Sequence, residues 1–370
     1  MTQFLRTRPA TTVAMLAVYD DGAAIRHGLA FEAALARAQA DPPLADEIAQ
    51  ACASIEIDPA ELAEEAAHAG TLAIPLVARL RAALSEQAAQ AVHRGATSQD
   101  LADTIMVLQA KDATALVDAN VMRLTEALAV IADRHAETPA VGRTLLQDAL
   151  PITFGLRAAQ WLAGVHDAGR DFRSASDRAL LLQFGGAVGT RAASPAIAAA
   201  LGLRIPPAPW HARRGAIAGL GASLGILIGV IAKVARDIAL LAQQGIAEAH
   251  EPFAPGRGGS SAMAHKRNPT GCQIALSAAL RAPGLVAGML AGLPQELERG
   301  LGGWQAEAPV LADLFMLADG AAEAMANVAE DLDVDAAAMA RNLAAAGIGC
   351  HVGDSASLAR TLVERYRENR

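Results

Sequence analysis

The chain is poor in cysteine, in aromatic residues and in charge. Its three cysteines, Cys52, Cys272 and Cys350, lie far apart and form no C-x-x-C motif, which argues against a disulfide scaffold and against a structural zinc site. We therefore expect each cysteine to be a small buried apolar residue in a reducing compartment. Aromatic residues make up only 3% of the 370 residues, so the core must be built from Ala, Leu, Val and Ile.

The balance of apolar and charged residues limits the class of protein. Hydrophobic residues reach 53% and charged residues 19%, a composition that excludes disorder for most of the chain. The formal net charge is −8, which argues against a nucleic-acid partner because phosphate binding needs a broad basic surface. Since alanine is the strongest helix former, the composition favours an all-α fold.

Two apolar runs could be mistaken for membrane signals. Residues 10–18 follow two arginines but lack a convincing cleavage site for a signal peptide. Residues 215–232 carry no charge and are at the lower length limit for a bilayer span. This second run contains several glycines, and Lys233 and Arg236 continue its helical pattern. We expect it to be a buried helix of a bundle, in a cytoplasmic protein with no membrane partner.

Long helices dominate the predicted organisation. Residues 98–138 contain neither Gly nor Pro, and roughly 40 helical residues span about 60 Å. Their apolar positions recur at spacings of three and four, which places one stripe on one face and requires partner helices of similar length. The partner helices are predicted at 152–182, 215–249, 270–293 and 309–332. We find no alternating strand pattern, so the predicted fold is an all-α bundle of long helices.

Shorter helices precede the bundle. One is predicted to begin after Asp58, where Asp-Pro-Ala-Glu has the spacing of a capping box, and to end at Gly70. Another is predicted from Pro75 to Val92. The expected domains are an N-terminal helical domain (1–97), a central long-helix domain (98–335) and a C-terminal helical segment (336–370).

Three interruptions between the helices carry unusual sequence. They are residues 93–100 (HRGATSQD), 142–148 (GRTLLQD) and 256–269 (GRGGSSAMAHKRNP), which we call the first, second and third breaks. Thr97 and Ser98 precede the longest helix, where they serve either as a plain N-cap or as binders of a carboxylate. The third break is either a basic surface loop or an anion cradle, since its glycines and serines expose many N–H groups beside three cationic side chains.

The remaining titratable residues give little signal. Most histidines are scattered along helices, and no H-x-x-x-H motif or acidic cluster suggests a metal site. The carboxylates of the helices are interpreted as solvated surface charges. A serine of the third break can act as a base only if N–H groups and a cation stabilise its alkoxide.

The third break resembles the signature G-S-S-x-M-x-x-K-x-N-P of the fumarase/aspartase superfamily. Within that superfamily the chain is most similar to the bacterial 3-carboxy-cis,cis-muconate cycloisomerases. This likeness covers about residues 10–345 and also rests on residues 182–187 (LQFGGA), 210–214 (WHARR) and 294–307 (PQELERGLGGWQAE). It implies a mostly helical subunit, a homotetramer with a central 20-helix bundle, and active sites that combine the three breaks of three different subunits.

The resemblance also implies a reaction and a set of residues. The reaction closes 3-carboxy-cis,cis-muconate to 4-carboxymuconolactone in protocatechuate breakdown by the beta-ketoadipate pathway, without a cofactor or a metal. The substrate is a tricarboxylate, so a protein of net charge −8 must supply local cations. The family pattern implies catalytic roles for Ser260, with Ser261 as the fallback, and for Lys266. It implies substrate binding by His93, Arg94, Thr97, Ser98, Gln147, Arg214, Arg257 and Asn268.

Several positions depart from the superfamily pattern. Leu145 and Leu297 stand where a histidine is expected, Asp148 replaces another, Ala264 replaces the signature proline, and Gly245 falls where a glutamate is expected. The C-terminal domain of the family is expected to be reduced to a short segment. These departures keep two alternatives open: another lyase of the superfamily that releases fumarate, such as adenylosuccinate or argininosuccinate lyase, and a non-catalytic helical paralogue.

Overall fold

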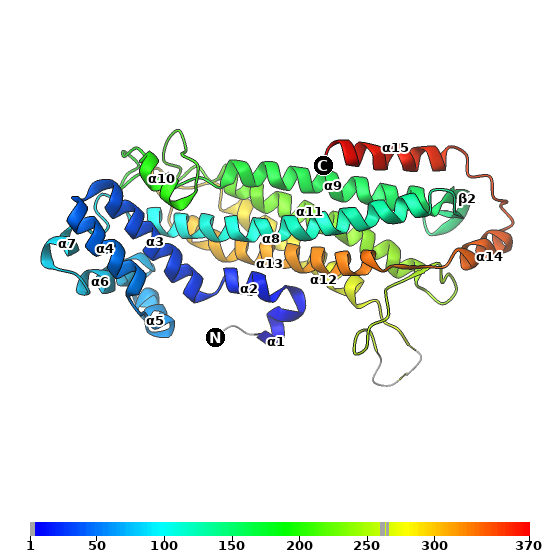
Figure 1. Cartoon of the computed structure of the whole chain (residues 1–370), viewed down its shortest axis with the longest axis horizontal. Helices are drawn as coiled ribbons and strands as arrows, with labels where there is room; N and C mark the ends of the chain where they lie inside the picture. Colours follow the sequence, from blue (N-terminus) through cyan, green and yellow to red (C-terminus); the bar gives the residue numbers. More distant parts are fainter. Residues whose placement is uncertain (1–3, 260–262, 264–265) are drawn as a thin grey trace.

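The computed structural model describes residues 4–259, 263 and 266–370 as an elongated helical molecule (Figure 1). Five long helices lie side by side along its long axis. They are α8 (Ser98–Arg134), α9 (Phe154–Ala179), α11 (Gly215–Leu241), α12 (Thr270–Ala291) and α13 (Gly303–Glu330). The prediction of an all-α bundle of long helices is confirmed. Four of the helices are somewhat shorter than predicted, whereas α13 begins six residues before its predicted start.

Helix α8 is the longest helix of the described chain. It contains 37 residues, which at 1.5 Å per residue span about 55 Å. Its predicted apolar stripe is buried from end to end, with Leu101, Val117 and Leu128 fully enclosed. Neighbouring helices approach closely where small residues meet. Gly155 on α9, for example, packs directly against the backbone of Ala132 and Ala136.

Small helices cover the end of the bundle at which α8 begins (Figure 1). They are α3 (Asp21–Gln39), α4 (Pro42–Ser54), α5 (Pro59–Ala69), α6 (Ala73–Ala82), α7 (Glu86–Ala91) and α10 (Pro195–Leu201), preceded by α1 (Phe4–Thr7), a 3-10 turn (Arg8–Ala10) and α2 (Val13–Val18). The predicted start of α5 is confirmed, because the Asp58 carboxylate accepts from the N–H groups of Ala60 and Glu61. The single helix predicted from Pro75 to Val92 is wrong, since Ser85 caps a separate α7 there.

A β-hairpin corrects the expectation that the chain contains no strand. Strands β1 (Pro139–Thr144) and β2 (Gln147–Thr153) pair antiparallel, and the second break forms their turn. Leu145 and Leu146 occupy this two-residue turn with φ values of 52° and 64°. Both values lie in the left-handed region, which such turns require and which Asn-Gly usually supplies. An apolar Leu-Leu pair carries no hairpin signal, so this turn could not be predicted from the sequence.

The chain ends beside the bundle. Strand β3 (Ala249–His250) pairs with β4 (Asp333–Val334), and β4 leads into α14 (Ala336–Ala346). Helix α15 (Ser355–Glu368) then returns along α9 and α8 (Figure 1). The Tyr366 hydroxyl donates a hydrogen bond to Thr125 Oγ1 on α8 at 3.2 Å. Ion pairs between arginines of this segment and α8 or its end add to the contact: Arg360–Glu137, Arg367–Asp133 and Arg370–Glu126.

Two helices are long and apolar enough to cross a membrane by length and composition, α11 and α12. Core helices of globular proteins pass the same test. Of the most apolar stretch of α11, 56% is buried, as predicted for a bundle helix, but only 22% of that of α12 is buried. Helix α12 exposes Leu280 and Leu290, and α11 exposes Ile226 beside it. This apolar face is therefore open in a single chain.

The cysteines follow the prediction only in part. Cys272 is buried, and burial raises the pKa of its thiol well above the usual value. Cys52 is half-buried, and burial raises the pKa of its thiol to about 12. Cys350 is exposed, which contradicts the expectation of a buried residue, because it lies in the irregular segment between α14 and α15.

Replacing Gly155 with alanine tests the close packing of α9 on α8. An added Cβ would lie within 2.6 Å of backbone atoms of Ala132 and Ala136, which cannot move independently of α8. We expect Gly155→Ala to destabilise the protein by about 2 to 4 kcal/mol, measured as a fall in Tm. The control Gly22→Ala meets only the ends of two flexible side chains at 3.3 Å. An unchanged Tm in Gly155→Ala would contradict the packing described.

Candidate active site

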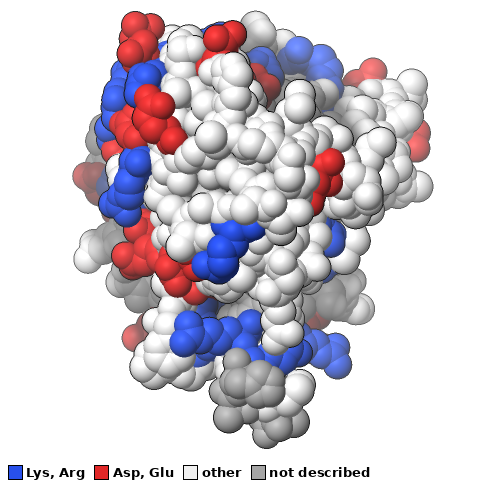
Figure 2. Space-filling model, turned by 90° about the vertical axis from the view of Figure 1, so that its right-hand side faces the viewer, with Lys and Arg blue, Asp and Glu red and all other residues white. Residues whose placement is uncertain are grey.

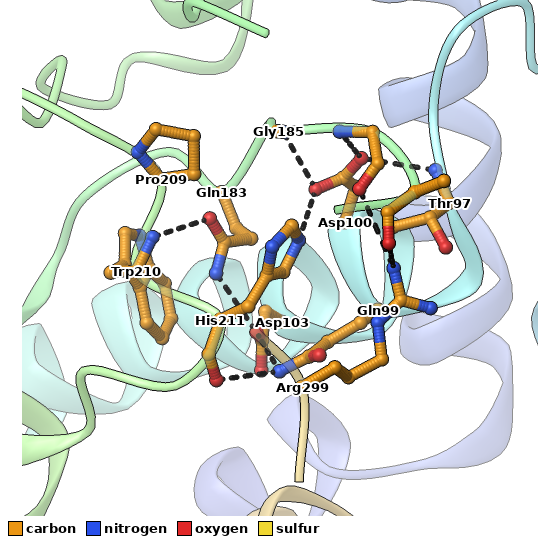
Figure 3. Close-up of polar contacts among 12 residues, drawn as sticks. Thr97, Gln99, Asp100, Asp103, Gln183, Gly185, Pro209, Trp210, His211 and Arg299 are labelled. Carbon is orange, nitrogen blue, oxygen red and sulfur yellow. Dashed lines mark hydrogen bonds and ion pairs between the residues drawn. The ribbon is translucent and has the colours of Figure 1, made fainter. Parts of the chain in front are cut away.

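A buried carboxylate organises the first break. Asp100 is fully buried in the first turn of α8, and its two oxygens accept four hydrogen bonds (Figure 3). Oδ1 accepts from the Gly185 N–H at 2.9 Å and lies 2.7 Å from His211 Nε2. Oδ2 accepts from the N–H groups of Thr97 at 3.0 Å and Gly186 at 2.9 Å. Asp100 thus holds three segments together: the start of α8, residues 182–187 and residues 210–214.

A second buried carboxylate lies one turn further along α8. Asp103 accepts hydrogen bonds from both terminal nitrogens of Arg214, each at 2.8 Å. It also accepts hydrogen bonds from the side-chain amides of Gln99 and Gln183. Arg214 also donates to Glu307 Oε2 from two of its nitrogens, at 2.8 and 2.6 Å. Burial lowers the pKa of Arg214, but the two carboxylates outweigh burial and raise it above its usual value. Burial also raises the pKa of Glu307, against the opposing effect of Arg214.

Arg214 is therefore buried, whereas a substrate-binding residue was expected to be accessible. Its side chain is 0% exposed, and its three nitrogens are all bonded within the chain. Its guanidinium also lies 4.6 Å from the centroid of the Trp210 ring. These contacts make Arg214 a support beneath the first break and leave no donor turned toward solvent.

The other predicted residues of the first break lie at its surface. Thr97 and Ser98 are half-buried at the start of α8, and Arg94 is exposed. The His93 side chain is 15% exposed, and its Nδ1 lies 2.6 Å from Oε1 of the buried Glu32. Four of the predicted residues thus lie together at one end of the bundle.

The segment before α13 also reaches this end. The Arg299 guanidinium donates to the backbone oxygen of Ala187 at 2.7 Å, beside Asp100 and Thr97 (Figure 3). Leu297, which stands at an expected histidine position, has a φ of 46° and is 88% exposed. A histidine at this position would therefore be as exposed as Leu297 in the single chain.

The second break lies at the opposite end of the molecule. Arg143 on β1 donates to both oxygens of Glu248, at 3.0 and 2.8 Å, and to Asp148 at 3.1 Å. The Glu248 carboxylate, through its hydrogen bonds, raises the pKa of Arg143. Glu248 is fully buried and also accepts from Asn342 Nδ2 at 2.7 Å. Gln147 is exposed beside the Leu145–Leu146 turn.

Gly245 remains a departure from the superfamily pattern, which led us to expect a glutamate there. A buried glutamate, Glu248, follows three residues later, just before β3. It joins the hairpin to α14 through Arg143 and Asn342.

The third break closes at a narrow neck. The Asn268 N–H donates to the Gly258 backbone oxygen at 2.7 Å. Gly258 has a φ of +70°, and an added Cβ would lie 2.5 Å from the Asn268 oxygen, so only glycine fits. Ser260 and Ser261, the predicted catalytic serines, and Ala264 lie outside the described residues. After the neck, Glu251 accepts from the N–H groups of Gly271 and Cys272 and so caps α12.

The cations of the third break are only partly neutralised. Arg257 is half-buried and lies 3.8 Å from Glu251. The Arg267 guanidinium lies 5.1 Å from the centroid of the exposed Phe253 ring, and Lys266 is exposed. Figure 2 shows this end of the molecule, where Lys and Arg residues gather at the lower edge of a largely uncharged face. This end therefore offers positive charge to an anion.

The breaks do not meet within one chain. The first break begins α8, whereas the second follows its end, about 55 Å away for a helix of this length. The third break emerges near the same end as the second (Figure 1). Among the described residues, no three His, Cys, Asp or Glu side chains gather closely enough to hold a metal ion.

Sequence reasoning missed the buried carboxylates. Those of Glu32, Asp100, Asp103, Glu248 and Glu307 are enclosed, although the carboxylates of the helices were expected on solvated faces. Asp100 alone had a local signal, since it stands three residues after Thr97, the spacing of a capping box. The partners of the others come from distant segments, such as Arg214 for Asp103, and so leave no mark in the local pattern.

Residues 14–284 match the profile of the family described as "Lyase". The chain therefore belongs to this lyase family of enzymes, the fumarase/aspartase superfamily. The fold agrees with a solved structure of the 3-carboxy-cis,cis-muconate lactonizing enzyme from Pseudomonas putida. The TM-score is 0.87 at 38% identity, and the match covers 99% of this chain and 89% of that one.

Several curated proteins are similar to this chain over most of its length. The 3-carboxy-cis,cis-muconate cycloisomerase of Bradyrhizobium diazoefficiens is 44% identical over 349 residues, which cover 90% of this chain and 77% of the relative. That of Pseudomonas aeruginosa is 44% identical over 345 residues, covering 89% and 75%. The nitrosuccinate lyase of Streptomyces davaonensis is 36% identical over 351 residues, covering 88% and 74%.

Replacing Asp100 with asparagine tests its role in holding the first break. An asparagine keeps one oxygen, so its NH2 group would face either the N–H groups of Thr97 and Gly186 or those of Gly185 and His211. In either orientation two buried donors would lose their acceptor. We expect Asp100→Asn to lower stability by about 3 kcal/mol, measured as Tm. Asp112→Asn is the control, because Asp112 lies on the same helix with a 53% exposed side chain and should change stability by less than about 0.5 kcal/mol. Equal effects of the two substitutions would refute this role.

Proposed function

We propose that this protein is a 3-carboxy-cis,cis-muconate cycloisomerase that forms 4-carboxymuconolactone without a cofactor. The observation that carries the proposal is the 44% identity to two curated cycloisomerases over nine tenths of the chain. Such an enzyme would act in the cytoplasm on a tricarboxylate of the beta-ketoadipate pathway. The reaction is an isomerisation: one carboxylate oxygen of the substrate adds to a C=C bond, and a proton reaches the neighbouring carbon.

We further propose that each active site combines the three breaks of three subunits in a homotetramer. The length of α8 supports this, because it separates the first break from the second and third within one chain. The open apolar face of α11 and α12 supports an assembly around a central 20-helix bundle, since burying apolar area drives association. The hairpin turn also exposes Leu145 and Leu146, by 96% and 76%, as a partner surface would require.

In this proposal the three breaks contribute different groups to each active site. His93, Arg94, Thr97 and Ser98 bind substrate carboxylates at the start of α8, and Gln147, Arg257 and Asn268 contribute from other subunits. Ser260, or failing that Ser261, exchanges the proton, while Lys266 stabilises the negative charge that develops on a carboxylate during addition. Arg214 takes a supporting position beneath the first break. The two ends thus supply cations to a trianionic substrate although the whole chain is acidic.

One alternative is a fumarate-releasing lyase of the same superfamily. Two relatives favour it: nitrosuccinate lyase, and the N-acetyl-S-(2-succino)cysteine lyase of Enterococcus italicus, 33% identical over 349 residues. The departures at Leu145, Ala264 and Leu297 from the superfamily pattern motivate both this alternative and a non-catalytic paralogue.

A direct assay tests the proposed reaction. Purified protein is added to 3-carboxy-cis,cis-muconate, and loss of the diene ultraviolet absorbance is followed. We expect rapid loss with a lactone as the product. If the folded protein gives no loss above the uncatalysed rate, the cycloisomerase proposal is wrong, and release of fumarate from succinyl substrates is tested next.

Ser260→Ala tests the proposed catalytic serine. Removing the hydroxyl should lower kcat by about 10²-fold or more if the serine exchanges the proton, while light scattering shows an unchanged assembly. Ser261→Ala is the matched variant on the neighbouring residue. Near-normal kcat for Ser260→Ala together with a large loss for Ser261→Ala would move the role to Ser261.

Mixing two inactive variants tests the shared site. Thr97→Val damages the first break and Ser260→Ala the third, so hybrid tetramers contain some sites in which neither substitution is present. We expect activity to return after the two variants are dissociated and reassembled together. The control is each variant reassembled alone, which should stay inactive. No recovery from confirmed hybrids, or a monomer in light scattering, would contradict sites shared between subunits.

A further inference from the structure

His93 and Glu32 form an unusual pair at the edge of the first break. Glu32 lies within α3 and is fully buried, and its Oε1 is 2.6 Å from His93 Nδ1. Its other oxygen, Oε2, is also buried and has no partner among the described residues. Buried carboxylates normally accept several hydrogen bonds. Within the described part of the chain, the imidazole ring of His93 is the one hydrogen-bonding neighbour of this carboxylate.

The contact fixes the direction of the ring. Nδ1 donates to the carboxylate, and because the two ring nitrogens point in nearly opposite directions, Nε2 faces away from the buried Glu32. The side chain is 15% exposed, and Nε2 makes no hydrogen bond with the part of the chain that the structure describes. His93 also has a φ of 61°, a left-handed conformation that turns the chain just before Thr97 and Ser98. The ring is thus held on its inner side and open on its outer side.

Two other histidine–carboxylate pairs do not combine a buried carboxylate that has few partners with a partly exposed imidazole ring. His211 contacts Asp100, but that carboxylate already accepts three backbone N–H groups, and the ring is only 2% exposed. His27 lies on α3 near Glu32 and contacts Asp112 at 3.4 Å, but the side chain of Asp112 is 53% exposed. The first is a structural contact, and the second is a solvated surface pair of little energetic weight.

We infer that Glu32 is a positioning residue that holds His93 Nδ1 turned inward, so that Nε2 faces a carboxylate of the substrate and, when it carries a proton, donates a hydrogen bond to it. A hydrogen bond from one ring nitrogen to a buried carboxylate fixes the direction in which the other ring nitrogen points. The charge-assisted Nε2–H donor then meets an anionic substrate beside Thr97 and Ser98. Glu32 acts here through His93 and makes no contact with substrate itself. The inference rests on the proposed function, because it concerns the binding of the same substrate.

The test is a double-mutant cycle with Glu32→Gln, His93→Gln and the double variant. Because the interaction exists in both the ground state and the transition state, each single substitution should raise KM for 3-carboxy-cis,cis-muconate by about tenfold or more with a smaller change in kcat. The double variant should be no worse than His93→Gln, since Glu32 acts through the ring. Glu32→Asp should restore part of the loss. Asp112→Asn, which changes the carboxylate of the exposed pair between His27 on α3 and Asp112 on α8, should leave KM within about twofold.

The outcomes separate this inference from the proposed function. If the wild type turns over the substrate but the two substitutions are additive, or Glu32→Gln behaves like Asp112→Asn, the inference is wrong and Glu32 is structural. If the wild type shows no turnover, the proposed function fails, and nuclear magnetic resonance of the imidazole decides the inference instead. The nitrogen chemical shifts of His93 should place a proton on Nδ1 in the wild type, and Glu32→Gln should change these shifts. Identical shifts in the two proteins would overturn the inference.

Discussion

The length of helix α8 is the constraint on which the rest of the structure depends. Thirty-seven residues without glycine or proline form a rigid rod of about 55 Å, and segments with unusual sequence lie at both of its ends. The surrounding long helices bury its apolar stripe, and the loops that join them lie at the two ends. A chain built in this way cannot assemble all three breaks by itself, which is why the proposed site requires other copies of the chain.

Buried carboxylates hold the irregular loops in place, because these loops have few large apolar side chains to bury. Asp100 gathers two loops onto the start of α8, and Glu248 joins the hairpin to α14 through Arg143 and Asn342. Glu251 caps α12 directly after the neck of the third break. A buried carboxylate is stable only when hydrogen bonds surround it, so each of these groups fixes the position of its donors. The loops therefore gain definite positions although their residues are small or polar.

The sequence was sufficient for the long helices but not for the features between them. Apolar residues at spacings of three and four predict α8, α9, α11, α12 and α13 because helix burial is periodic. The hairpin was missed because Leu145 and Leu146 adopt positive φ values that leucine rarely adopts. The residues of the first break were found by resemblance, but the buried states of Arg214 and Asp100 depend on partners more than 80 residues away. Such long-range pairs leave no local pattern.

The return of α15 along α8 has a consequence for the order in which the protein is made. Tyr366 contacts Thr125 across 241 residues of sequence, and Arg367 contacts Asp133 across 234. During synthesis α8 emerges long before α15 exists, so the α8–α9 surface that α15 later covers stays open to solvent and to other nascent chains. Because domains begin to fold while translation proceeds, the earlier helices can pack against one another before α15 joins them. Ribosome-bound chains of this protein are therefore expected to carry a partly formed bundle that is completed only after α15 has been synthesised.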